Sequence, residues 1–375
     1  MSLTLPRFTV RGTPEELGTA YGSEFRDLIR RFIPMRFEAL LGHFAEAGAG
    51  DLDGVRRVGR ESYPFFLRFD PEGAAEHEAT ARGAGVDPVD LFTAGNMTDL
   101  RDATILRGPA PSRRQGSGLP ADAEGCSAVL IPGSHTDTGH QIVGQTWDLN
   151  PEDVEYIVAL HRVPDTGPAT WTVTVAGCPT LVGMNQHGLA VGTTNIKTWG
   201  SRPGVGYLNV LHKAVRCSSA EEAVAVVHGA SRAGAHTYWL ADGARAIELE
   251  TSPDAVVVRE ATDAPVIRTN HCLAPAITRA EWQTPSSSSL TRLKRLQGLL
   301  APPGQSVDGL RAALGSRQDG ADSVSRHATD GEGTATNAVI IAVPAERGLY
   351  ACRGPAELGD WVQLSFSDRV AASGG

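Results

Sequence analysis

The sequence predicts an α+β fold in which a helical N-terminal segment precedes an antiparallel β-sandwich that carries helices on its outside. Residues 1–110 place apolar side chains at helical spacing. From Cys126 onward the spacing shifts toward two, and helical stretches return between the strands. Strands interrupted by helices in one long segment indicate sheets packed together under helices. The chain has 375 residues and 41% hydrophobic residues, which is enough for a sizeable core.

The first helix is expected to begin at Thr13-Pro14-Glu15-Glu16, where a capping hydroxyl precedes a proline and two acids. Its apolar face consists of Leu17, Tyr21, Phe25, Leu28, Ile29 and Phe32. Further helices are expected over residues 35–46, 54–69 and 71–84, and from Asp87-Pro88 toward Asp99. Between residues 107 and 124 the chain is rich in Gly, Pro, Ser and Arg, which favours an exposed, flexible loop.

Six of the expected strands form three pairs, each around a turn. They cover residues 127–132 and 141–145, 155–163 and 170–176, and 181–184 and 189–194. Helices follow over 205–215 and from Ser219, which begins a capping-box pattern. Short strands are expected over 236–241, 246–250 and 255–259, helices over 290–300 and 306–314, and final strands over 338–343, 348–351 and 362–365.

Composition and charge exclude several classes of function. The net charge of −9 argues against a nucleic-acid binder or a protein that binds anionic membranes. No apolar run approaches the ~20 residues of a membrane helix, and the N-terminus has no signal segment. The five cysteines are scattered without CxxC spacing, which favours neither a zinc site nor a disulfide framework. A reducing, cytoplasmic setting fits best.

Cys126 is the candidate nucleophile. A cysteine at a strand start is more often a small buried hydrophobe, but this one follows Gly125 and a loop. Because Gly125 has no Cβ, the backbone before the cysteine can adopt strained dihedrals, which suits attack by the Cys126 sulfur on the Gly125 carbonyl. The cut would free the Cys126 α-amine, whose ordinary pKa of about 8 lets it take the thiol proton. Nucleophile and base would then share one residue.

Several segments resemble the acyl-coenzyme A:6-aminopenicillanic acid acyltransferase family, the C45 peptidase group of N-terminal-nucleophile hydrolases. Gly125-Cys126-Ser127 is similar to the family's cleavage site, with Ser127 in place of the threonine of the best-known members. The other similar segments follow in the family's order and span nearly the whole chain. They are residues 12–22, Gln145-Thr146-Trp147-Asp148, residues 183–190 with Thr193-Thr194-Asn195, Thr269-Asn270-His271, residues 323–327 and Arg353-Gly354-Pro355.

The resemblance implies an αββα fold and self-cleavage between Gly125 and Cys126. Residues 1–125 would become a small subunit that stays bound to residues 126–375. It also implies acyl transfer or amide hydrolysis through a thioester, acting on a small N-acyl or acyl-thioester substrate. No cofactor is implied, although acyl-CoA could serve as an acyl-donor substrate.

Four further residues take roles from the resemblance, each beside a simpler reading. Asp148 would hold the new α-amine by a charge-assisted hydrogen bond, or is a strand-end turn residue. Asn270 would donate to the oxyanion, or belongs to a loop that hydrogen-bonds itself. Asn195 would be a second donor, or a strand-end residue. Arg326 would orient Asp148 or face a substrate carboxylate, or lies on the surface.

The remaining candidates are expected to be structural. His161, His212 and His271 lack metal-ligand spacing. Cys178, Cys217, Cys272 and Cys352 are expected to be buried and inert. The helix over 290–300, with Arg292, Lys294 and Arg295, reads as a surface helix with a solvated face. Two alternatives to the favoured function stay open: a bile-salt-hydrolase-like C–N amidase, and a non-catalytic binding protein that retains the fold.

Overall fold

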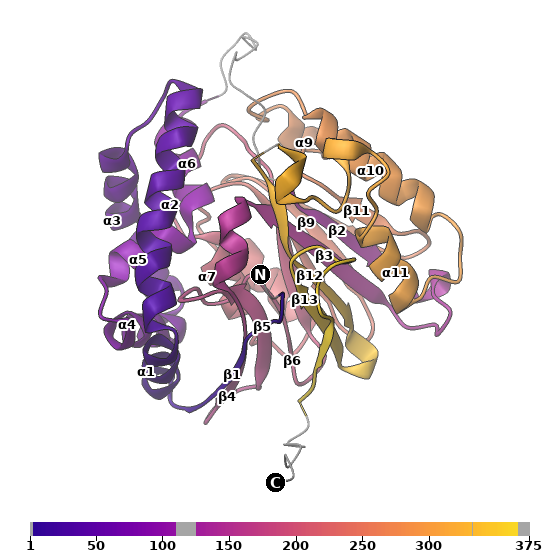
Figure 1. Ribbon diagram of the computed structural model, residues 1–375, viewed down its shortest axis with the longest axis horizontal. Helices are drawn as coiled ribbons and strands as arrows, with labels where there is room; N and C mark the ends of the chain where they lie inside the picture. The colour runs from indigo at the N-terminus through magenta and orange to yellow at the C-terminus, as the bar shows by residue number, and fades with distance from the viewer. Residues whose placement is uncertain (1–2, 110–124, 332, 367–375) are drawn as a thin grey trace.

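Two β-sheets packed face to face form the centre of the molecule, and helices cover both outer faces (Figure 1). The computed structural model describes residues 3–109, 125–331 and 333–366. One sheet has eight strands in the order β1-β4-β5-β6-β7-β8-β9-β10, and the other has six in the order β11-β2-β3-β12-β13-β14. The predicted αββα arrangement is therefore confirmed. The basic loop expected before Cys126 lies outside the described residues from position 110 on.

The strands of the two sheets are short and mostly buried. The eight-stranded sheet contains β1 (Arg7–Gly12), β4 (Ile157–Pro164), β5 (Thr170–Val175), β6 (Val182–Asn185), β7 (Ala190–Asn195), β8 (His236–Ala241), β9 (Ala246–Thr251) and β10 (Val256–Glu260). The six-stranded sheet contains β2 (Ser127–Ile131), β3 (Ile142–Leu149), β11 (Val266–Arg268), β12 (Ala335–Val343), β13 (Gly348–Arg353) and β14 (Val362–Leu364). The three predicted pairs β2–β3, β4–β5 and β6–β7 all form. Strands β1 and β11 were not predicted.

The N-terminal segment forms helices α1 (Pro14–Glu24), α2 (Arg26–Ala47), α3 (Leu52–Phe69), α4 (Pro71–Ala84), α5 (Pro88–Gly95) and α6 (Met97–Ile105). Thr13 and Glu16 form the capping box that starts α1. The apolar face predicted from Leu17 to Phe32 spans two helices, because α1 ends at Glu24 and α2 begins at Arg26. Strand β1 pairs in parallel with β4, so this segment also contributes to a sheet.

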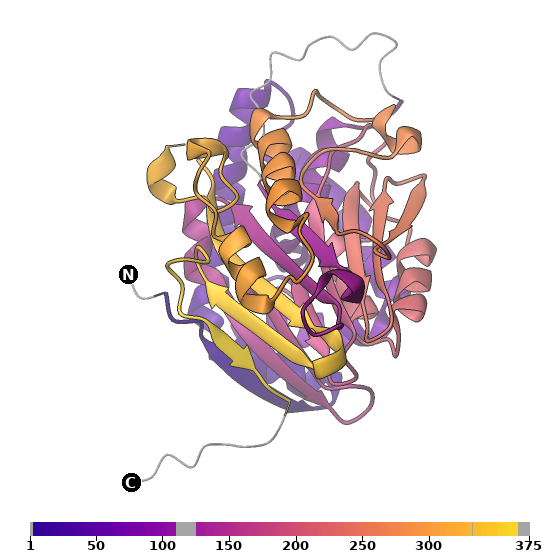
Figure 2. The same ribbon diagram turned by 90° about the vertical axis from the view of Figure 1, so that its right-hand side faces the viewer.

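Helices on opposite sides of the molecule cover different sheets. Helices α1 and α4 pack against β4, and α7 (Tyr207–Ala214) and α8 (Ala220–Gly229) also lie on the eight-stranded sheet. On the six-stranded sheet, Leu296, Leu300 and Leu310 of α10 (Ser287–Leu300) and α11 (Val307–Leu314) pack against Val129 and Ile131 (Figure 2, orange helices). A short unpredicted helix, α9 (Pro275–Thr278), precedes them. Across the described residues, no helix is both long and apolar enough to cross a membrane.

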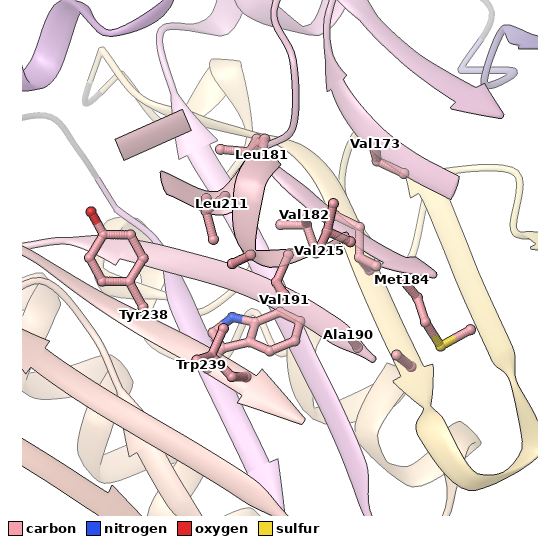
Figure 3. Close-up of a cluster of buried hydrophobic side chains, with 14 of the residues drawn as sticks. Val173, Leu181, Val182, Met184, Ala190, Val191, Leu211, Val215, Tyr238 and Trp239 are labelled. Atoms are coloured by element: carbon pink, nitrogen blue, oxygen red, sulfur yellow. The ribbon is translucent and has the colours of Figure 1, made fainter. Parts of the chain in front are cut away.

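The interface between the sheets is mostly apolar, and polar contacts also join the two sheets, among them the ion pair of Arg268 on β11 with Glu250 on β9 (2.9 Å). Figure 3 shows part of the apolar cluster, which includes Val173, Met184 and Trp239. Gln145 of β3 reaches into this interface, where its Oε1 accepts hydrogen bonds from Trp239 Nε1 (2.7 Å) and the backbone N–H of Thr193 (2.9 Å). A buried polar group is stabilising when it is paired in this way. These hydrogen bonds fix β3 against β7 and β8, three strands that border the site described next.

Candidate active site

Cys126 lies immediately before β2 and is directed into the space between the sheets. It clusters with Ala128 and Leu130 in the inter-sheet core, whereas Val129 and Ile131 face α10 and α11, as strand alternation requires. The cysteine is buried, and its Sγ lies 3.9 Å from the backbone oxygen of Asp148. A cavity opens beside it. The residues that line the cavity are Thr98, Cys126, Trp147, Asp148, Leu149, Leu181, Thr193, Asn195, Tyr207 and His236.

Asp148 is fully buried at the end of β3, next to the cysteine. Its Oδ2 accepts a hydrogen bond from Thr146 Oγ1 (3.4 Å), and its Oδ1 has no hydrogen-bond partner among the described residues. Burial raises the pKa of Asp148 to about 6, against the lowering effect of Arg292, Arg326 and hydrogen bonds from Thr336 and Thr146. The site thus holds a carboxyl group with one unused acceptor.

Arg326 is buried against Gly125 rather than lying on the surface. A Cβ built on Gly125 would be only 2.5 Å from Arg326 Nη1, so the guanidinium can hold its present position only beside a glycine. Gly125 is not among the residues with positive φ. The reason for the glycine is therefore close contact and not the strained backbone that the sequence suggested. Arg326 is held by Thr336, whose Oγ1 accepts from its backbone N–H (3.0 Å).

Arg292 is the main site residue that the sequence analysis missed. It was expected on a solvated helix face, but it is fully buried. Its Nη1 donates to the backbone oxygen of Cys126 (2.5 Å) and to Ser127 Oγ (2.9 Å). Its Nη2 donates to Asn270 Oδ1 (2.9 Å). Helical spacing contained the signal, because Arg292 precedes the buried Leu296 and Leu300 by four and eight positions.

The contact with Arg292 determines how the Asn270 side chain is oriented. A guanidinium can only donate, so the amide oxygen of Asn270 must face it and the NH₂ group must face the other way. There Asn270 Nδ2 donates to the backbone oxygen of Asn195 (2.9 Å). A side-chain amide carries two N–H groups, and this is the one bond from Asn270 Nδ2 seen among the described residues.

Asn195 connects two cavities at the end of β7. It lines the cavity of Cys126 and also a polar cavity formed with Lys197, Asn270, Glu281 and Ser286. The sequence-predicted residues Cys126, Asp148 and Asn195 thus border one space. Asn270 is linked to this group by its hydrogen bonds to Asn195 and Arg292. Arg326 is linked to it by its position next to Gly125, the residue before Cys126.

The loop that carries Asn270 is attached to the first turn of α10. The Ser289 hydroxyl accepts from the backbone N–H of Asn270 (2.9 Å) and bonds His271 Nδ1 (2.7 Å). Thr269 Oγ1 donates to the Ser289 backbone oxygen (3.0 Å). Burial, Arg268 and Arg292 lower the pKa of His271 to about 4, so its ring is neutral near pH 7. His271 therefore has a positioning role here.

His236 and Asp99 were also missed, and they come from different segments of the chain. His236 Nε2 bonds Asp99 Oδ1 at 2.8 Å, and its ring stacks on Tyr207 with centroids 4.4 Å apart. Asp99 Oδ2 accepts from the backbone N–H of Tyr207 (2.8 Å). No sequence motif marked this pair, because the residues lie 137 positions apart.

The other cysteines and histidines take structural positions. Cys178, Cys272 and Cys352 are buried as expected, and burial raises the pKa of each thiol, to about 12 for Cys178 and Cys352. Cys217, which was also expected to be buried, is only partly buried. His161 stacks on Trp171, and His212 Nδ1 bonds Thr180 Oγ1 (3.0 Å).

Two solved structures are similar to this chain at low identity. A mutant of the conjugated bile acid hydrolase from Clostridium perfringens has a TM-score of 0.41 and 10% identity, with 64% of this chain and 97% of that chain covered. Penicillin V acylase from Agrobacterium tumefaciens has a TM-score of 0.41 and 12% identity, with 65% and 86% covered.

Sequence comparison gives the family. A curated relative from Emericella nidulans, the acyl-coenzyme A:6-aminopenicillanic-acid-acyltransferase 40 kDa form, is 25% identical over 296 residues, which cover 78% of this chain and 76% of the relative. The model of the family described as acyl-coenzyme A:6-aminopenicillanic acid acyl-transferase matches residues 135–356, more than half of the chain. That match includes Asp148, Asn195, Asn270 and Arg326 and begins after Cys126. The chain belongs to the acyl-coenzyme A:6-aminopenicillanic acid acyl-transferase family.

Proposed function

We propose that the chain is a self-processing enzyme that transfers or hydrolyses acyl groups through a thioester on Cys126. The observation that carries this proposal is the convergence of Cys126, Asp148 and Asn195 on one cavity, with Arg292 bonded to the Cys126 carbonyl. The substrate would be a small N-acyl or acyl-thioester compound, with acyl-CoA as one donor. Membership of an acyl-transfer family supports this reaction class.

The first step would be cleavage of the chain itself. The Cys126 sulfur attacks the Gly125 carbonyl carbon, the carbon–nitrogen bond breaks, and the departing nitrogen takes a proton to become the α-amine. The Gly125 acyl group is now a thioester, and water opens it to a carboxylate and the free thiol. The position of Arg326 Nη1, where a Cβ on Gly125 would otherwise lie, supports this step, because a guanidinium beside the scissile peptide can stabilise the developing oxyanion.

The freed α-amine would then serve as the base of the enzyme. The unused Oδ1 of Asp148 is a suitable acceptor for this amine, because charge-assisted hydrogen bonds are the stronger kind. The amine takes the thiol proton, the thiolate attacks the substrate carbonyl, and the amine or thiol of the leaving group departs with that proton. Water or an acceptor amine then opens the acyl-enzyme. The second N–H of Asn270 is our candidate oxyanion donor.

The two subunits would stay together because the first shares a sheet and buried ion pairs with the second. Strand β1 pairs with β4 along six residues of each strand. Arg162 Nε donates to Glu76 Oε1 (2.6 Å), and Asp99 bonds His236, all in the buried interior. Separating the chains would expose these pairs and the apolar cluster of Val10, Leu17, Val158 and Leu160.

The test is the intact mass of the purified protein, measured beside a Cys126→Ala variant. We expect two fragments that end at Gly125 and begin at Cys126, and one full-length species for the variant. Reaction with an acyl thioester should then add one acyl group to the fragment that begins with Cys126. An uncleaved wild-type chain that gains no acyl group would favour the binding-protein alternative. Cleavage with hydrolysis only, and no transfer to added amines, would favour a C–N amidase.

A further inference from the structure

An extra residue interrupts β12 beside Asp148. Strand β12 is the neighbour of β3 in the six-stranded sheet (Figure 1). Thr336 pairs with Asp148 and Ala338 pairs with Trp147, which are consecutive residues of β3, so Asn337 has no pairing partner on that strand. One residue more on one strand than on the other is a β-bulge. Bulges are frequent next to active sites, where they change the direction of a side chain.

The bulge determines which face of the sheet Thr336 occupies. Ala338 lies in the apolar cluster between the sheets, whereas Val339 belongs to the cluster under α10 and α11. In an unbroken strand Thr336 would share the face of Ala338, because side chains alternate. With Asn337 inserted, Thr336 instead lies on the same face as its partner Asp148. Both side chains are fully buried there.

The inserted residue is held by contacts on two sides. Asn337 Nδ2 donates to the backbone oxygen of Asn150 (3.0 Å), two residues after Asp148. The backbone oxygen of Asn337 accepts from the N–H of Gly354 (2.8 Å), which directly follows β13. Asn337 is itself fully buried. The bulge is therefore a fixed part of the sheet, and so is the place of Thr336.

The Thr336 hydroxyl connects two of the predicted site residues. Its Oγ1 accepts from the backbone N–H of Arg326 (3.0 Å), and the backbone N–H of Thr336 donates to the Arg326 oxygen (2.9 Å). Because Oγ1 accepts on that side, its single proton can be donated to Asp148. Burial raises the pKa of Asp148, and a hydrogen bond from Thr336 is among the contacts that lower it. The other groups that face this carboxyl are Arg292, Arg326 and the Cys126 thiol.

We infer that Thr336 is a positioning residue of the proposed reaction, in which its hydroxyl holds the Asp148 carboxylate beside Cys126. This inference rests on the proposed function. Without the hydroxyl, Asp148 would keep its proton to a higher pH, because a hydrogen bond to the charged form of a group favours that form. A protonated Asp148 would no longer make a charge-assisted hydrogen bond to the α-amine of Cys126.

The experiment follows acylation of Cys126 by the acetyl thioester of N-acetylcysteamine across the acidic and neutral pH range. Intact mass of the fragment that begins with Cys126 gives the rate, so uncut molecules are not counted. Thr336→Val keeps the side-chain shape but lacks the hydroxyl. We expect the acidic limb of its profile, where the rate rises with pH, to move up by about one pH unit. Thr336→Ser retains the hydroxyl and should return the limb to its wild-type position.

Thr334→Val is the matched control. Thr334 is also fully buried, and its hydroxyl has no hydrogen-bond partner among the described residues. The same substitution there removes a buried hydroxyl without touching Asp148, so the acidic limb should stay where it is in the wild type. Circular dichroism of all three variants should show the wild-type fold.

The outcomes separate this inference from the proposed function. An unchanged acidic limb in Thr336→Val, with the wild type reacting normally, would overturn the inference and leave acyl transfer intact. A uniform loss of rate at every pH, without a shift of the limb, would show a purely structural role and would also overturn it. The same holds if Thr336→Val and Thr336→Ala both fail to fold. A wild-type chain that is never acylated on Cys126 would overturn both proposals together.

Discussion

Arg292 donates a hydrogen bond of 2.5 Å to the backbone oxygen of Cys126, which joins helix α10 to the start of β2. The same guanidinium bonds Ser127 Oγ and Asn270 Oδ1, each at 2.9 Å. One buried cation therefore fixes the candidate nucleophile and the candidate oxyanion donor relative to each other. Burial lowers the pKa of Arg292 to about 10. The cost of burying this charge indicates that the position needs the several N–H donors of a planar guanidinium, a geometry that lysine cannot reproduce.

The first prediction concerns this arginine. Arg292→Lys keeps the positive charge but loses the bidentate geometry, so Cys126 and Asn270 should lose their alignment. We expect acylation of Cys126 to fall on the order of 10²-fold, which is typical for the loss of one oxyanion contact. Circular dichroism should show a folded chain. Lys294→Ala, an exposed residue on the same helix, is the matched control and should react at the wild-type rate. A wild-type rate in Arg292→Lys would exclude a positioning role.

The second prediction separates self-cleavage from acyl transfer. In Gly125→Ala the new methyl group would meet Arg326 Nη1 at 2.5 Å and push the guanidinium away. We expect self-cleavage to slow about 10-fold or more, measured as the fraction of intact chain over time. Molecules that have been cut should transfer acyl groups normally. Gly298→Ala, where a Cβ meets nothing within 4 Å, should cleave as the wild type does. Equal cleavage rates in the two variants would contradict the contact argument.

The fold could be predicted largely from local patterns. The capping residues Thr13 and Glu16 predicted the start of α1. Turn residues between stretches of alternating apolar and polar residues predicted the three hairpins. Strand β1 was missed because it pairs with β4, about 150 positions later in the chain. Its extended conformation depends on this pairing more than on its own sequence.

The site could be predicted only in part. Cys126, Asp148 and Asn270 stood in segments that resemble a known family. Arg292 lay in no such segment, and its charge led to the expectation that it faces solvent. Its helical register, however, matched that of the buried Leu296 and Leu300. The Asp99–His236 pair depends wholly on tertiary packing, so no local signal could reveal it.

The third prediction is a pH dependence of stability that comes from Asp148. Its folded-state pKa of about 6 lies above its ordinary value of 3.8, so the folded chain binds this proton more tightly than the unfolded chain. Stability from this group is therefore fully present below about pH 4 and is lost as pH rises toward about 6. In a Cys126→Ala background, which keeps the chain whole, Asp148→Asn should remove this slope, on the order of 2–3 kcal/mol. Urea unfolding across this pH range measures it, and identical slopes in both chains would refute it.

The fourth prediction concerns the association of the two subunits after cleavage. Asp99 lies in the N-terminal segment and accepts hydrogen bonds from His236 Nε2 and the Tyr207 backbone, each at 2.8 Å. Asp99→Asn keeps the size of the side chain but removes the charge opposite His236. It should weaken the association by about 1–3 kcal/mol, because charged hydrogen bonds in the interior exceed neutral ones. Size-exclusion chromatography of the cleaved protein in increasing urea measures the midpoint of separation. Asp53→Asn, an exposed residue of α3, is the control and should leave that midpoint unchanged. If Asp99→Asn separates at the same urea concentration as Asp53→Asn, the pair does not hold the subunits together.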